Sequence, residues 1–174
     1  MKRIVLFVVI ALTAGLTNCS TDAVVCVKNV DQAKLDAVPK TQLANDLIRI
    51  SAYLAANNIT GVTEDVSGLR YTITTLGTGQ TPCLSSTVVV NYSGKVLLAN
   101  NAQLASSTFD SNVGASFGLS GLITGWQVAF PKFPPGTSAV LYVPSGLAYG
   151  TGSPSTKVPA NSVLVFNVDL ISFQ

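Results

Sequence analysis

The sequence predicts an α+β domain, in which a mostly antiparallel sheet follows one N-terminal helix. Its 174 residues, 48% of them hydrophobic, are enough for one domain with its own core and are not typical of a disordered chain. Residues 41–60 repeat apolar side chains with a helical period, whereas the residues after Gly61 alternate as strands do. We therefore divide the chain into a signal peptide (1–18), a tether (19–40), a helix (41–60) and a folded domain (61–174).

The predicted signal peptide begins with two positive charges in Met1–Arg3 and continues with Ile4–Leu16, which is apolar except at Thr13. These thirteen residues fall short of the roughly 20 that cross a membrane and lie within the roughly 7–15 of a secretory signal peptide. The pattern indicates export.

Leu16-Thr17-Asn18-Cys19 resembles the lipobox of bacterial lipoproteins, in which the cysteine receives the lipid. The resemblance implies palmitate on Cys19 and a protein held at the bacterial cell envelope by its lipid anchor alone. The favoured location is the outer membrane, on its periplasmic or surface side. The alternative is an ordinary signal peptide beside an incidental cysteine.

The two remaining cysteines, Cys26 and Cys83, are an even number in an oxidising compartment. They form either a disulfide that pins the tether to the domain or two free buried thiols. Neither has a nearby base or a CxxC partner, so a catalytic role is disfavoured. The tether is polar and has room for a short helix over Asp31–Val38.

The helix over residues 41–60 carries one apolar stripe, made of Leu43, Leu47, Ile50 and Leu54. Thr41 is the expected N-cap, and Gly61 follows the end of the helix. The opposite face is expected to hold Gln42, Asp46 and Arg49. One helix cannot bury such a stripe alone, so it packs either on its own domain or on a second copy in a homodimer.

Four segments after Gly61 have the alternation and β-branched content of strands: residues 69–74, 87–92, 138–143 and 163–173. In the last of them, one face holds Leu164, Phe166, Val168 and Leu170. Asn167 and Asp169 fall on the other face. This pattern is typical of a sheet with one buried side.

The composition excludes several kinds of chemistry. The chain has no histidine, which excludes His-dependent triads and His-ligated metal sites, and the zinc-type cysteine spacings are absent. Its formal charge is +2, and loss of Lys2 and Arg3 makes it zero, so no basic surface for nucleic acid is expected. No cofactor or metal is predicted. What remains is a binding pocket, or catalysis without proton transfer, built from aromatic groups, hydroxyls and backbone amides.

Five ordered segments resemble the signatures of the FKBP-type peptidyl-prolyl cis-trans isomerases. They are Val90-Asn-Tyr-Ser-Gly94, Phe109-Asp-Ser111, Leu122-Ile-Thr-Gly-Trp126, Pro144-Ser-Gly-Leu-Ala-Tyr-Gly150 and Val158-Pro-Ala-Asn-Ser-Val-Leu-Val-Phe166. The resemblance implies a curved antiparallel sheet, or half-barrel, wrapped around a short helix that begins near Thr124. Residues 97–107 are expected to form a loop that is additional to the family's usual turn. The predicted helix over residues 41–60 is similar to the N-terminal extension of exported members of the family.

The resemblance also implies a role for each matched residue. Trp126 would be the floor of a proline-binding pocket, with Asp110 at its edge beside Tyr92. Tyr149 and the backbone N–H of Ile123 would donate hydrogen bonds to substrate carbonyls. The remaining wall residues would be Phe109, Leu122 and Phe166, with Val158 contributed by the loop before the last strand. Phe117 could belong either to the pocket or to the core.

The implied activity is isomerisation of Xaa–Pro bonds in exported polypeptides, with proline-containing clients as partners and macrolides of the kind that inhibit the family as ligands. The alternative is a catalytically weak proline-binding or chaperone module that uses the same pocket. A chemical argument agrees with isomerisation: a twisted amide has less charge separation than a planar one, so a dry aromatic pocket favours the twisted form.

The lipobox generates a direct prediction. Cys19→Ser should move the protein from the membrane fraction to the soluble fraction, because the acyl chains would supply its membrane affinity. Fractionation followed by mass spectrometry of the wild-type N-terminus checks this. An unmodified Cys19 still preceded by Asn18 would contradict the prediction.

Overall fold

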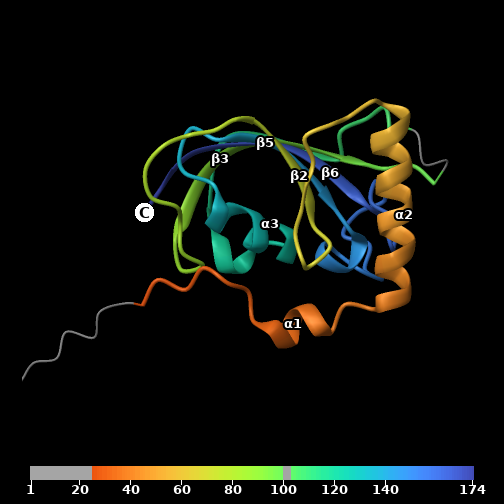
Figure 1. Ribbon diagram of the computed structural model, residues 1–174, viewed down its shortest axis with the longest axis horizontal. Helices are drawn as coiled ribbons and strands as arrows, with labels where there is room; N and C mark the ends of the chain where they lie inside the picture. The colour runs from red at the N-terminus through yellow and green to blue at the C-terminus, as the bar shows by residue number, and fades with distance from the viewer. Residues whose placement is uncertain (1–24, 100–102) are drawn as a thin grey trace, which may run out of the picture.

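The architecture comes from a computed structural model, which describes residues 25–99 and 103–174; the predicted signal peptide and Cys19 lie outside them. In this part of the chain, six strands form one antiparallel sheet in the order β1-β2-β5-β6-β3-β4, curved over α3 (Figure 1). The strands are β1 (Thr63–Glu64), β2 (Arg70–Thr75), β3 (Thr87–Val96), β4 (Asp110–Gly118), β5 (Ser138–Val143) and β6 (Leu164–Phe173).

Three α-helices accompany the sheet in the described residues: α1 (Gln32–Asp36), α2 (Lys40–Ala56) and α3 (Thr124–Ala129). Short 3-10 helices also occur in the described residues: η1 (Leu119–Gly121) and η2 (Phe130–Lys132) flank α3, and η3 (Ser145–Leu147) follows β5. Helix α2 stands at one end of the sheet, and α1 lies beyond its N-terminus (Figure 1).

Each of the four predicted strands has a counterpart, in β2, β3, β5 and β6. Strands β1 and β4 were not predicted. Strand β4 is an edge strand paired only with β3, and most of its side chains are exposed, so it lacks the apolar alternation that marks a half-buried strand. Strand β1 has two residues and no periodicity to detect.

The main core lies between the concave face of the sheet and α3. The residues of β6 that were expected on one face, Leu164, Phe166, Val168 and Leu170, are all buried in this core, and Asn167 and Asp169 are exposed. All six residues of α3 are buried. Gly125 is required there, because a Cβ on it would lie 2.6 Å from Cγ1 of Val143 in β5.

Helix α2 covers part of the other face of the sheet. The sequence predicted a sheet with only one buried side, but this second face is therefore partly buried as well. Ile50 and Leu54 pack with Tyr142 of β5 and Val165 of β6 in a second buried cluster. Arg70 of β2 also donates from Nη1 to the Ser51 hydroxyl at 2.6 Å. Two of the four stripe residues, Ile50 and Leu54, are thus covered by the chain's own sheet, whereas Leu43 and Leu47 are half-buried, and the homodimer stays a prediction.

Two details of α2 differ from expectation. The N-cap is Pro39 rather than Thr41, which lies inside the helix, and Pro39 makes no side-chain capping bond. Asp46 was expected on the polar face but is fully buried. Asp46 lies three positions after Leu43 and four positions before Ile50, and residues at these spacings share one face of a helix.

The segment before α2 is folded onto the domain. Asp31 caps α1 by accepting a hydrogen bond from the Ala33 N–H at 3.0 Å. Cys26 and Cys83 form a disulfide, with their Cα atoms 5.2 Å apart. Leu84 N–H donates to the Val27 carbonyl beside it. The described part of the predicted tether, from residue 25 onward, therefore runs along the surface of the domain to α2.

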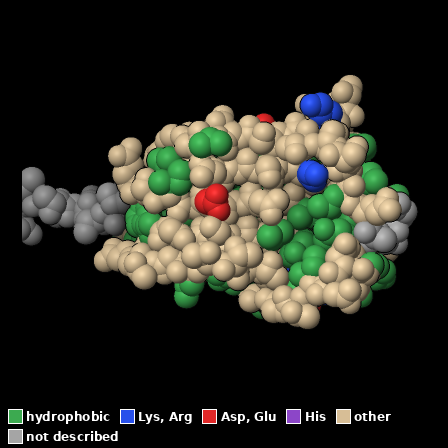
Figure 2. Space-filling view, turned by 90° about the horizontal axis from the view of Figure 1, so that it is seen from above, with side chains coloured by type: hydrophobic (Ala, Val, Ile, Leu, Met, Phe, Trp, Pro, Cys, Tyr) green, Lys and Arg blue, Asp and Glu red, His purple; other side chains and the backbone are tan. Residues whose placement is uncertain are grey.

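The surface carries few charges. In the view onto the top of the molecule, charged side chains are sparse and scattered, and apolar side chains gather toward the α2 end (Figure 2). The helices within residues 25–99 and 103–174 are too short or too polar to span a bilayer.

The disulfide should stabilise the fold by restricting the unfolded chain. It closes a loop whose ends are 57 positions apart, which corresponds to about 4 kcal/mol in the chain-entropy model. The double variant Cys26→Ser/Cys83→Ser should lose up to that much free energy of unfolding in urea titrations. Under reducing conditions the wild type should become equal to this variant; two free thiols in the unfolded, unreduced wild type would contradict the prediction.

Candidate active site

A cavity of about 140 Å³ opens between α3, β3, β4 and the loop after η3. It is lined mainly by aromatic and aliphatic side chains, with one carboxylate: Tyr92, Asp110, Phe117, Leu122, Ile123, Trp126, Tyr149 and Phe166. An apolar cavity of about 150 Å³ accommodates benzene. This cavity therefore has room for one small ring.

Trp126 is the centre of the aromatic side chains around the cavity. It lies on α3 and is 4% exposed. The rings of Tyr92, Phe130 and Phe166 meet it edge to face, with centroid distances of 5.4, 5.1 and 5.3 Å. Such edge-to-face pairs each add about 0.5–1.5 kcal/mol beyond the area they bury. The indole ring is therefore held in one orientation by three elements, β3, η2 and β6.

Tyr92 and Asp110 form the polar edge of the cavity. The Tyr92 hydroxyl donates to Oδ2 of Asp110 at 2.8 Å, across the pairing of β3 with β4. Burial, followed by the hydrogen bond to Asp110 and its negative charge, raises the pKa of Tyr92 to about 12. Burial, and then the charge of Asp110, also raises the pKa of Tyr149 above its usual value. Both phenols are therefore neutral donors at physiological pH.

Among the donors that line the cavity, the Ile123 backbone N–H and the Tyr149 hydroxyl have no hydrogen-bond partner within the described residues. Ile123 is the N-cap of α3, and its N–H is one of those that a helix cannot satisfy itself. The Tyr149 side chain is 40% exposed, and its hydroxyl makes no hydrogen bond in the described part of the chain. Both donors are free to bind carbonyl oxygens of a ligand.

Gln127 holds the turn that presents Ile123, and sequence reasoning missed it. Its side-chain amide donates to the carbonyls of Leu122 at 2.6 Å and Ser120 at 3.0 Å. It is 5% exposed, and its carbonyl accepts from Lys34 Nζ of α1 at 3.3 Å. The signal in the sequence was its position directly after Trp126, the single tryptophan, in a segment predicted to lie in the domain.

Two predicted wall residues lie behind the cavity rather than in its lining. Phe109 meets Phe166 edge to face at 5.6 Å and supports it from outside. Val158 is 1% exposed in the main core, because the turn from Ser155 to Val158 directs it inward. Gly94 makes room for Phe109 and Phe166, since a Cβ on it would lie 2.7 Å from each ring.

Phe117, which the sequence left between pocket and core, lies in the lining and meets Tyr92 at 6.0 Å. The remaining predicted residues, Leu122, Ile123, Trp126 and Phe166, come together with Tyr92, Asp110 and Tyr149. No cluster of three or more His, Cys, Asp or Glu side chains that could hold a metal occurs among residues 25–99 and 103–174. The site thus combines an apolar ring-sized cavity with two unpaired donors at its rim.

Comparison with known proteins places this geometry in a family. Residues 79–171 match the family described as FKBP-type peptidyl-prolyl cis-trans isomerase. The peptidyl-prolyl cis-trans isomerase Mip of Coxiella burnetii is 38% identical over 122 residues, covering 70% of this chain and 52% of that protein. The FkpA isomerase of Aeromonas hydrophila is 34% identical over 147 residues, covering 82% of this chain and 53% of that protein. The chain thus spans about half the length of these curated relatives.

Solved structures agree in fold. The crystal structure of FkpA from Escherichia coli has a TM-score of 0.63 and 32% identity, covering 82% of this chain and 64% of that chain. A peptidyl-prolyl cis-trans isomerase from Pseudomonas syringae also has a TM-score of 0.63, with 27% identity, covering 78% of this chain and 95% of that chain. The curved six-stranded sheet around a short helix is the fold of these isomerases, and the chain belongs to the FKBP-type peptidyl-prolyl cis-trans isomerase family.

Proposed function

We propose that this chain catalyses cis–trans isomerisation of Xaa–Pro bonds in exported polypeptides. The observation that carries the proposal is the ring-sized aromatic cavity over Trp126, with unpaired donors at Ile123 and Tyr149 on its rim. A proline ring would occupy the cavity, and the two donors would bind carbonyls on either side of it.

The chemistry needs no nucleophile. Rotation about the Xaa–Pro bond must overcome about 18–20 kcal/mol, most of it amide resonance. Twisting the bond returns the lone pair to the proline nitrogen and reduces the charge separation of the amide. An apolar site therefore binds the twisted amide better than the planar one, and binding that is stronger in the transition state is catalysis.

The site residues divide into three roles under this proposal. Trp126 and Phe166 form the apolar floor and wall that exclude water. Ile123 N–H and the Tyr149 hydroxyl hold the backbone of the substrate at two points. Asp110 orients Tyr92 by their hydrogen bond and places a negative charge at the rim. It is not expected to transfer a proton.

The proposed location is the cell envelope, with the chain anchored by a lipid on Cys19. The motifs at Met1–Cys19 support it, and a relative 36% identical over 122 residues is named outer membrane protein MIP in Legionella longbeachae. The proposed partners are proline-containing exported chains, and macrolide inhibitors of the family would compete for the same cavity. The Cys26–Cys83 disulfide suits an oxidising compartment.

Loss of the Tyr149 hydroxyl should slow catalysis without loss of the fold. Tyr149→Phe removes one hydrogen bond of about 0.5–1.5 kcal/mol and almost no volume. We expect kcat/KM for a short Xaa–Pro peptide to fall by about tenfold or less, with an unchanged urea midpoint. Tyr53→Phe is the matched control, because it removes a phenol hydroxyl on α2, outside the cavity lining.

Equal activity of Tyr149→Phe and the wild type would remove this tyrosine from the mechanism. An inactive wild type that still binds the peptide would instead favour the proline-binding module.

The rate should be nearly independent of pH between about 6 and 8. The chain has no histidine, and the pKa values of Tyr92 and Tyr149 are raised, so neither phenol ionises in that window. At higher pH the unfolded chain loses its Tyr92 proton near pH 10 and the folded chain only near 12. The stability that this phenol contributes is therefore lost as the pH rises between those values. A steep pH–rate profile between 6 and 8, with the fold intact, would argue for acid–base chemistry.

A further inference from the structure

A buried carboxylate on the N-terminal helix contacts the loop that carries Tyr149. Asp46 lies on α2 and Ser145 begins η3, and both residues are fully buried. They are 99 positions apart in the sequence. Charged side chains are almost never fully buried unless they are paired, so the partners of the Asp46 carboxylate must explain its burial.

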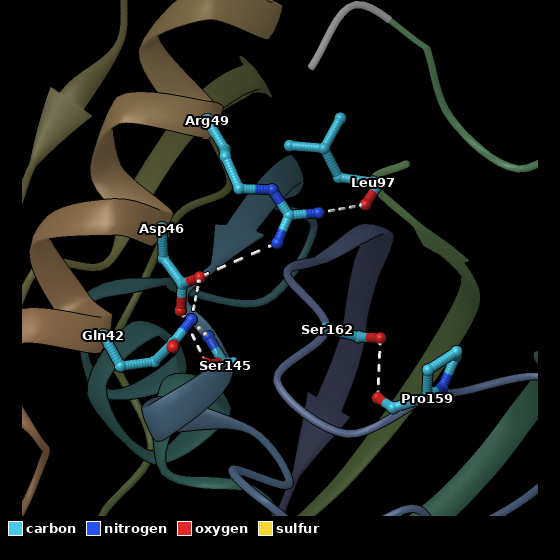
Figure 3. Close-up of polar contacts among 7 residues, drawn as sticks. All are labelled: Gln42, Asp46, Arg49, Leu97, Ser145, Pro159 and Ser162. Carbon is cyan, nitrogen blue, oxygen red and sulfur yellow. Dashed lines mark hydrogen bonds and ion pairs between the residues drawn. The ribbon is translucent and has the colours of Figure 1, made fainter. Parts of the chain in front are cut away.

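In the part of the chain that the structure describes, the polar contacts of the Asp46 carboxylate are all with donors (Figure 3). Oδ2 accepts from the Ser145 N–H at 2.8 Å and from the Ser145 hydroxyl at 2.6 Å. Oδ1 accepts from Gln42 Nε2 at 2.9 Å and lies 3.8 Å from Nη1 of Arg49. Hydrogen bonds to an ionised acceptor are about twice as strong as neutral ones. Two of these bonds cross from α2 to the loop, and both end on Ser145.

Ser145 in turn holds the two neighbours of Tyr149. Its carbonyl accepts from the Ala148 N–H at 3.0 Å and from the Gly150 N–H at 2.8 Å. The backbone on either side of Tyr149 is therefore fixed to the residue that Asp46 fixes. Tyr149 itself lies outside the strands and is 40% exposed, so the contacts of its neighbouring backbone contribute to where its hydroxyl lies.

Helix α2 also contacts the residue that follows β3, through Arg49. While Nη1 of Arg49 faces Asp46, its Nη2 donates to the Leu97 carbonyl at 2.7 Å (Figure 3). Leu97 is the first residue of the additional loop predicted from the sequence and is fully buried. Helix α2 is thus bound to the domain by directed contacts as well as by its apolar stripe.

We infer that Asp46 is a positioning residue, which fixes the Tyr149 hydroxyl over the cavity through Ser145. The inference rests on the proposed function for its effect on the rate, but the contact chain itself can be measured without activity. It gives α2 a part in catalysis even though no residue of α2 lines the cavity.

The test compares Asp46→Asn and Ser145→Ala with Ile50→Val. Asp46→Asn keeps the shape and removes the charge and one acceptor; Ser145→Ala removes only the hydroxyl bond and is the milder variant. Ile50→Val weakens the packing of α2 without touching Ser145. At matched fractions folded, we expect kcat/KM to fall about three- to tenfold in Asp46→Asn, less in Ser145→Ala, and not at all in Ile50→Val.

Two further readouts separate positioning from stability. Adding Asp46→Asn to Tyr149→Phe should cost less than about twofold, because the hydroxyl that Asp46 positions is already absent. The amides of Ala148 and Gly150 should exchange with solvent faster in Asp46→Asn, relative to those of β5, and at the wild-type ratio in Ile50→Val.

The inference is overturned if Asp46→Asn leaves those two amides at the wild-type ratio, or if its loss of rate persists undiminished in the Tyr149→Phe background. If the wild type shows no isomerisation, the proposed function fails, and the exchange of Ala148 and Gly150 still decides whether Asp46 holds the loop.

Discussion

The edge-to-face packing around Trp126 is the interaction on which the site depends. A six-residue helix has too few hydrogen bonds to be stable alone, so α3 forms only because the curved sheet buries all of it. That burial brings Tyr92 of β3 and Phe166 of β6 against one indole ring. The cavity is the space that these rings leave on the side of β4, so its apolar character follows from the core itself.

The polar groups at the rim complement this apolar floor without adding reactive chemistry. Burial, and then the hydrogen bond to Asp110 and its negative charge, raise the pKa of Tyr92 and so favour the neutral phenol. The Ile123 N–H is available because it begins a helix, and the Tyr149 hydroxyl is available because its loop leaves the sheet. Each donor thus owes its position to where an element begins or ends. Under the proposed function, the two donors would bind carbonyls on either side of the proline ring while the ring itself lies in the apolar cavity.

The sequence predicted most of this arrangement where periodicity is strong. The alternation in residues 163–173 identified both faces of β6. The resemblance of the ordered motifs to the FKBP-type family implied that Tyr92, Asp110, Ile123 and Trp126 share one pocket, and the cavity lining contains all four. The sequence could not predict β4, whose exposed side chains have no pattern, and so Phe117 stayed ambiguous. Asp46 was placed on the polar face because it is charged, although its spacing from Leu43 and Ile50 placed it inside; only the distant Ser145 explains that burial.

Under the proposed function, the apolar cavity accelerates rotation by favouring the twisted amide, without proton transfer. Exchange spectroscopy on an Xaa–Pro peptide, with the wild-type chain at catalytic concentration in H₂O and in D₂O, tests it most directly. We expect accelerated cis–trans exchange with a solvent isotope ratio near one. A peptide that binds the cavity without faster exchange, or an exchange rate that is clearly slower in D₂O because a proton moves in the transition state, would contradict it.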